Sequence, residues 1–214
     1  MNVSRETFHR RLEKVAGVSV SLSVLEKFEI YIQQIKKWQA HINLISSNDL
    51  QNIEERHVID SAQLFFWAKG SKVWADIGAG CGFPSLVLAI LDSDFPSKEF
   101  RLIEKNHKKT TFLSHVGRLL NLQIKVVQQD VRELNWKDCD VITARGFSSL
   151  ANLFEAAEPL RADQTRMIFL KGKKVQEEID EALKLWEISY KLYQSHTDPS
   201  GHIVDITHVK RRKT

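Results

Sequence analysis

The chain is poor in the residues on which several common classes of protein depend. Its 214 residues include only two cysteines, Cys81 and Cys139, which are too few for a disulfide framework or a zinc cluster. No run of eighteen apolar residues occurs, so no membrane-spanning helix is predicted. The start of the chain is polar and charged and lacks the apolar segment of a signal peptide. We therefore expect a soluble protein of the reducing cytoplasm.

A large excess of one charge is also missing. Lys and Arg number 31 against 27 Asp and Glu, and the formal net charge is +4, which by itself does not identify a nucleic-acid-binding protein. The eight histidines show no spacing typical of metal ligands, and we predict no metal site. The length suits one sizeable core with a modest extension and is too short for two full-size domains.

The first 70 residues are predicted to be helical. Between residues 22 and 42, apolar side chains such as Leu25, Phe28 and Ile32 recur every three to four positions, which marks one face of an amphipathic helix. Asp49 is expected to cap a further helix that runs to about Ala68. We predict a helical N-terminal extension over residues 1–70.

From Val73 the pattern changes to short β-rich runs separated by helical periodicity. Alternation of this kind predicts a parallel sheet with helices on both faces. The last two runs lose helical spacing and are expected to form an antiparallel hairpin. The expected strands cover 73–77, 100–103, 124–127, 141–143, 167–170, 189–193 and 203–209, and the expected helices cover 112–120, 150–157 and 175–185.

The most informative motif is the glycine-rich segment after the first expected strand. Gly78, Gly80 and Gly82 alternate after Asp76, and glycines there let a ligand lie directly on main-chain N–H groups. A dinucleotide-binding turn needs a further glycine at position 83, where this chain has Phe83. The spacing therefore favours S-adenosylmethionine (SAM) over a nicotinamide cofactor.

The glycine motif and the terminal hairpin together predict the fold class. SAM-dependent methyltransferases add such a hairpin to a Rossmann-like sheet, so we predict an α/β class I SAM-dependent methyltransferase domain over residues 71–209. Residues 210–214 are predicted to be a basic tail.

Candidate ligands also follow the next two strands, because open α/β sheets bind ligands beyond the carboxyl ends of their strands. Glu104 is placed to accept hydrogen bonds from both hydroxyls of a ribose. Asp130, Val131 and Arg132 are expected to frame an adenine ring. In the alternative interpretation, Glu104 caps the next helix and Asp130 begins a turn; we favour the ligand roles.

Basic residues gather at the same edge of the predicted sheet. Lys108, Lys109, Lys173 and Lys174 are expected in the first turns of helices, where a cation opposes the helix dipole and costs some stability. That cost argues for a function, and a phosphate backbone is the partner that fits. The cations are Lys105, Lys108, Lys109, Arg145, Lys171, Lys173 and Lys174.

Several segments match one known family. The most specific are Asn43-Leu44, Arg56-His57-Val58-Ile59-Asp60-Ser61, Asp76-Ile77-Gly78-Ala79-Gly80-Cys81-Gly82-Phe83-Pro84, Lys109-Thr110-Thr111-Phe112-Leu113, Thr143-Ala144-Arg145-Gly146-Phe147-Ser148-Ser149-Leu150 and Leu170-Lys171-Gly172. In these the chain resembles the RsmG (glucose-inhibited division protein B) methyltransferases, which modify guanine N7 in bacterial 16S ribosomal RNA. Ser85, Arg132 and Gly146 depart from the residues usual in the family, which are glycine, an acidic residue and alanine.

The resemblance implies roles for individual residues. SAM contacts are implied for Gly78, Phe83, Val131, Arg132 and Arg145. Positions kept around the pocket, with RNA as the implied partner, are Arg56, His57, Asp60, Lys109, Arg145 and Lys171.

We predict from these observations an rRNA (guanine-N7)-methyltransferase that works as a monomer on 16S rRNA or the small ribosomal subunit. N7 has a lone pair and no proton, so Arg145 and Lys171 would position groups and no general base is needed. The predicted cofactor residues are Asp76, Gly78, Gly80, Gly82, Phe83, Glu104, Asp130, Val131, Arg132 and Arg145. The predicted RNA residues are Arg56, His57, Asp60, Lys108, Lys109, Lys171, Lys173 and Lys174.

Other classes of function remain open on the sequence. The nearest alternative is a SAM-dependent methyltransferase that acts on another RNA or on a small molecule. A nicotinamide-dependent oxidoreductase is disfavoured by Phe83. A non-catalytic RNA-binding protein would have no use for an intact cofactor loop.

Overall fold

An open sheet organises the chain. The computed structural model describes residues 3–68 and 70–213, and the order of its seven strands is β3-β2-β1-β4-β5-β7-β6. The first five strands are mutually parallel, whereas β6 and β7 form an antiparallel hairpin with β7 beside β5. The strands are β1 (Val73–Ile77), β2 (Glu99–Ile103), β3 (Ile124–Val127), β4 (Val141–Arg145), β5 (Arg166–Lys171), β6 (Trp186–Gln194) and β7 (His202–Arg211). The predicted α/β fold with a terminal hairpin is confirmed.

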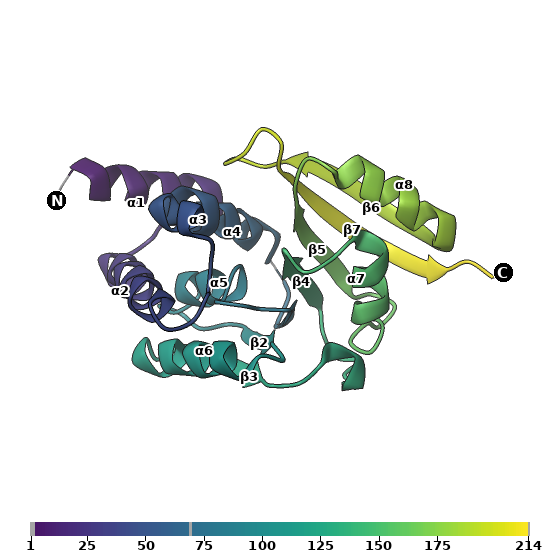
Figure 1. The fold of residues 1–214 in the computed structure, drawn as a ribbon. Coiled ribbons are helices and arrows are strands. Elements are labelled where there is room, and N and C mark those ends of the chain that lie inside the picture. The colour runs from purple at the N-terminus through teal and green to yellow at the C-terminus, as the bar shows by residue number, and fades with distance from the viewer. Residues whose placement is uncertain (1–2, 69, 214) are drawn as a thin grey trace.

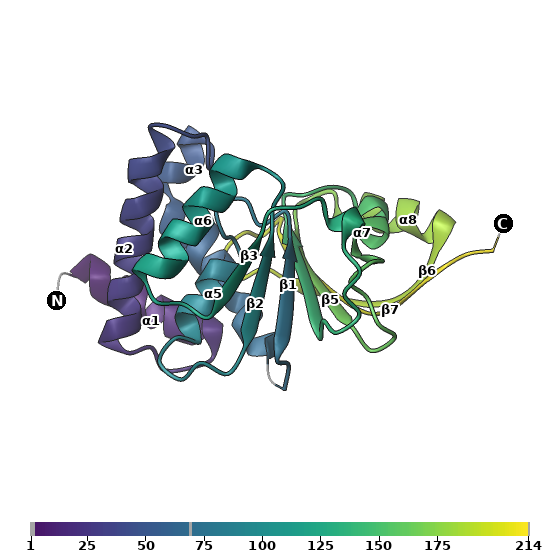
Figure 2. The same cartoon turned by 90° about the horizontal axis from the view of Figure 1, so that it is seen from below.

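Helices cover both faces of the sheet (Figures 1 and 2). One face carries α5 (Ser85–Leu91) and α6 (His107–Leu119), and the other carries α7 (Leu150–Ala157) and α8 (Val175–Leu185). From β1 the chain moves outward to β3, whereas from β4 it moves outward in the opposite direction. Right-handed crossovers in opposite directions place their helices on opposite faces. The predicted bounds of α7 and α8 are confirmed.

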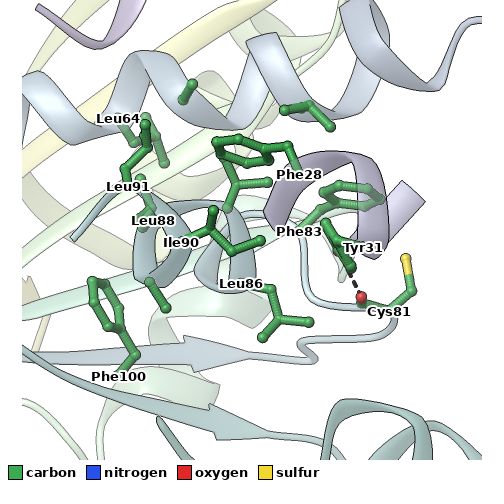
Figure 3. Packing of buried hydrophobic residues seen from close by; sticks show 14 of the residues in the cluster. Phe28, Tyr31, Leu64, Cys81, Phe83, Leu86, Leu88, Ile90, Leu91 and Phe100 are labelled. Carbon is green, nitrogen blue, oxygen red and sulfur yellow. Dashed lines mark hydrogen bonds between the residues drawn. The ribbon is translucent and has the colours of Figure 1, made fainter. Parts of the chain in front are cut away.

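The N-terminal helices form a further layer outside α5 and α6. Figure 2 shows α1 (Val3–Ala16), α2 (Leu22–Gln39) and α3 (Ser47–Gln51) on that side of the sheet. Phe28 of α2 belongs to the same buried cluster as Leu88 of α5 and Phe100 of β2 (Figure 3). The helical extension therefore shares one core with this face of the sheet.

The segment before β1 differs from the single helix predicted from Asp49. Ser46 is the N-cap of α3, because its hydroxyl accepts the N–H of Asp49, so the predicted cap at Asp49 is wrong. The chain continues as a π-helical turn, η1 (Glu54–Ile59), then α4 (Asp60–Ala62) and a 3₁₀ turn, η2 (Gln63–Ala68). Single π turns are frequent at functional sites, and η1 contains two of the predicted site residues.

The hairpin is longer than predicted. β7 runs to Arg211, so Lys210 and Arg211 lie in the sheet and only the end of the predicted basic tail follows it. Within residues 3–68 and 70–213, no helix is long and apolar enough to cross a membrane. The same residues contain no group of three or more His, Cys, Asp or Glu placed to hold a metal ion.

Candidate functional site

Two cavities lie at the carboxyl edge of the sheet. The first cavity has a volume of about 230 Å³ and is lined by Ile77, Gly78, Ile103, Glu104, Lys105, Lys109, Gln129, Asp130, Val131, Arg132, Gly146 and Phe147. The second cavity has a volume of about 630 Å³ and is lined by Arg56, Asp60, Arg145, Gly146, Leu170, Lys171, Gly172, Glu178, Ser195, Thr197, Asp198, Pro199, Gly201 and His202. Gly146, directly after β4, lines both.

The glycine loop after β1 adopts a backbone that other residues rarely take. The φ angles of Gly78, Gly80 and Gly82 are +69°, +59° and +104°. A Cβ on Gly82 would lie 2.3 Å from the Leu86 side chain, and one on Gly78 would lie 2.4 Å from the Phe147 ring. Because contacts this short cannot be accommodated without movement, both positions require glycine.

Glu104, directly after β2, holds this loop in place through hydrogen bonds to its carboxylate. The side chain accepts the Gly80 N–H at 3.1 Å and the Asn106 N–H at 2.8 Å, and the residue is only 8% exposed. The N-cap of α6 is Asn106, not Glu104, since the Asn106 side chain accepts the N–H of Lys109. Glu104 thus faces the first cavity and also orders the loop opposite.

Asp130, Val131 and Arg132 come together beside Glu104 in the lining of the first cavity. Asp130 does begin a turn, η3 (Val131–Glu133), because its carboxylate accepts the Arg132 N–H at 3.1 Å. Val131 is buried and supplies an apolar wall. The Arg132 side chain is 67% exposed and its Nε lies 3.3 Å from Asp130. Asp130 therefore begins the turn and also lines the first cavity.

The other cofactor residues predicted in and beside the glycine loop support the loop without lining a cavity. Asp76 is fully buried in β1 and accepts hydrogen bonds from the Ser85 N–H at 3.3 Å and the Thr143 hydroxyl at 3.2 Å. Burial raises the pKa of Asp76 to about 7, against the lowering effect of these bonds. Neither Asp76 nor Gly80, Gly82 and Phe83 lines either cavity.

An aromatic stack attaches the N-terminal helices to the glycine loop. The His57 ring lies parallel to Phe83 with centroids 4.8 Å apart, and the Tyr31 hydroxyl donates to the Cys81 carbonyl at 2.8 Å (Figure 3). Burial lowers the pKa of His57 to about 3, so its ring is neutral at pH 7. Neither ring nitrogen has a hydrogen-bond partner among the described residues. At 7% exposure, His57 is placed for packing and not for the predicted contact with RNA.

Asp60 connects three distant parts of the chain. Its Oδ2 lies 3.4 Å from Nε of Arg145, and its Oδ1 accepts from Ser195 at 3.1 Å and from Thr197 at 2.8 Å. Arg145 also donates to the carbonyl of Arg56 at 2.9 Å. Arg145 is therefore held by α4 and η1 in the lining of the second cavity, while Asp60 has its oxygens occupied within the protein. Although Arg145 was also predicted to contact the cofactor, it does not line the first cavity.

Lys171 forms an ion pair with Glu178, a residue that was not predicted from the sequence. Its Nζ lies 2.6 Å from Oε2 of Glu178 and donates to the Ser148 carbonyl at 2.6 Å. The same Glu178 oxygen accepts the Leu150 N–H at 3.0 Å. With its side chain only 10% exposed, Lys171 is a fixed cation whose charge is balanced inside the cavity.

The remaining predicted RNA residues lie on the surface around the cavities. The Arg56 side chain is 61% exposed. Lys108 and Lys109 lie in the first turn of α6 as predicted. Lys173 and Lys174, both exposed, precede α8, with Lys174 at its N-cap, so the prediction of a first-turn position is wrong for these two.

Sequence reasoning missed other parts of the two linings. Phe147, 39% exposed, covers Gly78. The sequence pattern that could have predicted it is an aromatic residue directly after Arg-Gly at the end of a strand. Ser195 and Thr197 lie in the β6–β7 loop, where the sequence shows only a turn. Glu178 lies in the first turn of α8, a position typical of an ordinary acidic residue at a helix start.

The first cavity fits a nucleoside-bearing cofactor. Ile103, Val131 and Phe147 provide apolar walls, and two carboxylates, Glu104 and Asp130, provide acceptors for hydroxyl and amino groups. Gly78 lines the cavity, and the absence of a Cβ there makes room for the Phe147 ring.

Solved structures share the fold. TYW2 of M. jannaschii in complex with AdoMet matches 81% of this chain and 80% of its own with a TM-score of 0.55 at 17% identity. A ribosomal protein L11 methylase from Lactobacillus delbrueckii subsp. bulgaricus matches 72% of this chain and 78% of its own with a TM-score of 0.56 at 16% identity.

Sequence relatives are much closer. A ribosomal RNA small subunit methyltransferase G from Rhodospirillum rubrum is 37% identical over 92% of this chain and 96% of its own length. One from Rickettsia prowazekii is 34% identical over 91% of this chain and 99% of its own. The family model GidB, rRNA small subunit methyltransferase G, matches residues 24–204. The resemblance drawn from the motifs is thereby confirmed, and the chain belongs to the rRNA small subunit methyltransferase G (GidB) family.

Proposed function

We propose that this chain transfers a methyl group from SAM to N7 of a guanine in bacterial 16S ribosomal RNA. The observation that carries the proposal is the junction of two unlike cavities at Gly146, one with apolar walls and carboxylates and the other with fixed and exposed cations. Membership of the family supports the assignment, since the relatives are named for the RNA of the small ribosomal subunit.

The first cavity is the proposed SAM site. Glu104 and Asp130 would accept hydrogen bonds from the ribose and adenine, and Val131 would pack against the ring, with the Arg132 backbone beside it. Asp76, Gly80, Gly82 and Phe83 would act by holding the loop. When bound, SAM supplies the activated methyl group, and the chain needs only to align it with the acceptor.

The environment of the cysteines supports a mechanism without a covalent enzyme intermediate. Burial raises the pKa of Cys81 to about 12 and that of Cys139 to about 11, so neither forms a thiolate nucleophile near neutral pH. A ring nitrogen with a free lone pair requires no such nucleophile. Arg145 and Lys171, both fixed by carboxylates, are the proposed positioning cations beside the acceptor.

The exposed cations are proposed to hold the RNA backbone. Arg56 and the partly exposed Lys109 line the cavities, and Lys108, Lys173 and Lys174 lie one or two positions from lining residues in the sequence. These cations would supply affinity that depends on salt and not on sequence. We also propose that the enzyme is cytoplasmic and that it acts as a monomer. Light scattering of the protein with and without RNA would test the oligomeric state.

The test is to incubate the protein with radiolabelled SAM and either unmodified small ribosomal subunits or their free RNA, and then to identify the labelled nucleoside. Labelled 7-methylguanosine is the expected product. If SAM binds and no RNA is labelled, the cofactor assignment stands and the substrate assignment moves to the small-molecule alternative.

A further inference from the structure

We propose that the second cavity receives the methyl-accepting guanine nucleotide and that Glu178 selects guanine by accepting a hydrogen bond from its 2-amino group. The inference rests on the proposed function and adds to it the place of the base and the residue that reads it.

The second cavity has the position that a methyl acceptor requires. It meets the first cavity at Gly146, whose φ is +64° and whose missing Cβ would have no atom within 4 Å. Apart from its chain neighbours Arg145 and Phe147, no described residue lies against this side of Gly146, and the two cavities share this glycine as a wall. The volume of about 630 Å³ lies in the range typical of small-molecule sites.

One wall of the cavity is a loop that is ordered before any ligand arrives. In the β6–β7 loop, the Ser195 N–H donates to the Gly201 carbonyl at 3.0 Å and the Gly201 N–H donates to the Asp198 carbonyl at 2.9 Å. Asp60 binds two hydroxyls of the same loop. A wall fixed in this way can discriminate between ligands by shape and hydrogen bonding, since little ordering remains to be done on binding.

Glu178 lines this space and has one carboxylate oxygen free of the contacts that hold the other. Its Oε2 is occupied by Lys171 and by the Leu150 N–H, whereas no residue in the described parts of the chain donates to its Oε1. The side chain is 24% exposed and lines the cavity. Lys171 and the Leu150 N–H hold the carboxylate in one orientation, so Oε1 is a fixed acceptor.

Guanine can pair with such an acceptor through its 2-amino group. Adenine and cytosine carry their amino donors at C6 and C4 instead, so a base held with its C2 edge towards Oε1 donates a hydrogen bond only if it is guanine, and a carboxylate oxygen can only accept. An acceptor that the bound base removes from water discriminates against an analogue without the donor, because the acceptor is then left unpaired.

The experiment compares guanosine with inosine, which lacks only the 2-amino group, at the mapped target position of a synthetic RNA. With the unaltered protein, we expect kcat/KM to fall at least about tenfold on the inosine RNA, the effect of one lost hydrogen bond to a charged group. Glu178→Gln should lower kcat/KM on guanosine by a similar factor and reduce the preference for guanosine over inosine. Glu177→Gln, at an exposed neighbour in the same turn of α8, is the matched control and should behave as the unaltered protein.

Each result bears on the inference separately from the proposed function. Equal rates on guanosine and inosine RNA, or an unchanged preference in Glu178→Gln, would overturn the role of Glu178. Absence of 7-methylguanosine with the unaltered protein would overturn the proposed function and this inference with it. SAM affinity of Glu178→Gln should match the control, whereas its melting temperature should fall because Lys171 loses its charge partner; if that variant does not fold, the inosine comparison in the unaltered protein and a Glu178→Asp variant decide the question.

Discussion

The two cavities are held open by different kinds of interaction. Around the first, the shape comes from backbone: left-handed glycines and the ends of β1 and β2. Around the second, it comes from side chains, above all the Asp60–Arg145 and Lys171–Glu178 ion pairs. A backbone-defined site is damaged by added atoms, whereas a site defined by charges is damaged by their removal. Variants should therefore separate cofactor binding from RNA methylation.

The largest effect should come from adding one carbon to the first cavity's loop. Gly82→Ala forces a left-handed residue, at φ +104°, against Leu86, and strain plus overpacking should lower the free energy of unfolding by about 3 kcal/mol. SAM affinity should fall at least tenfold in a calorimetric titration. Gly70→Ala is the control, because Gly70 is also left-handed, at φ +84°, and a Cβ added there would have no atom within 4 Å. Equal effects in the two variants would show that the loop tolerates the added atom.

The second cavity should respond most to loss of Arg145. Arg145→Ala removes the cation that joins β4 to Asp60 and to the Arg56 carbonyl, and we expect the single-turnover methylation rate to fall about 100-fold, as for removal of other preorganised electrostatic groups. SAM affinity should stay near that of the unaltered protein, because Arg145 lines the second cavity only. Arg118→Ala, on the exposed side of α6, is the control. A loss of SAM affinity as large as the loss of rate would contradict the separation of the two cavities.

The stack of His57 on Phe83 should make the free energy of unfolding depend on pH. The pKa of His57 is about 3 in the folded protein against an ordinary value of 6.5, so only the unfolded state takes up a proton as pH falls below 6.5. The protein should thus lose stability relative to His57→Phe from pH 6.5 down to about 3. Between pH 7.5 and 5 the difference should reach about 2 kcal/mol.

The comparison with His57→Phe is needed because Asp76 has the opposite effect. Its raised pKa, about 7, lets the folded state hold a proton that the unfolded state releases above pH 3.8, so its contribution is present at low pH and is lost as pH rises through 7. Asp76 is the same in both proteins, and denaturant unfolding of the pair at several pH values isolates His57. A pH-independent difference would mean that His57 has the same pKa in the folded and unfolded states.

The smallest effect should come from a single exposed lysine beside the cavities. Lys174→Ala should weaken RNA binding a few fold and lower the slope of log affinity against log salt concentration by about one. Lys184→Ala, at the other end of α8, is the control and should leave the slope unchanged. Identical slopes in both variants would place the RNA backbone elsewhere.

The contrast between a first cavity shaped by backbone and a second cavity shaped by side chains also explains what could be predicted from the sequence. Residues of the first cavity follow strands that periodicity predicts, so Gly78, Glu104 and Val131 could be placed at one edge from the order of elements alone. The strands at 73–77 and 124–127 were predicted with the bounds that the structure has.

The second cavity could be predicted only in part, because its contacts join residues far apart in the chain. Asp60 and Thr197 are 137 positions apart, and no periodicity relates them. Glu178 looks like any acidic residue in a first helical turn until Lys171 is placed beside it. The irregular path of residues 46–68, through α3, η1, α4 and η2, has an apolar pattern close enough to one helix that the sequence alone did not reveal the breaks.

The contacts of Asp60 with the β6–β7 loop make the second cavity depend on residues synthesised late. The first cavity needs only residues 77–147, all of which have been made while β6 and β7 are still to be translated. The second needs Ser195 through His202 together with Arg56, so it cannot close until nearly the whole chain has left the ribosome. The residues that line the proposed place for the methyl donor are thus all synthesised before those of the proposed place for the acceptor.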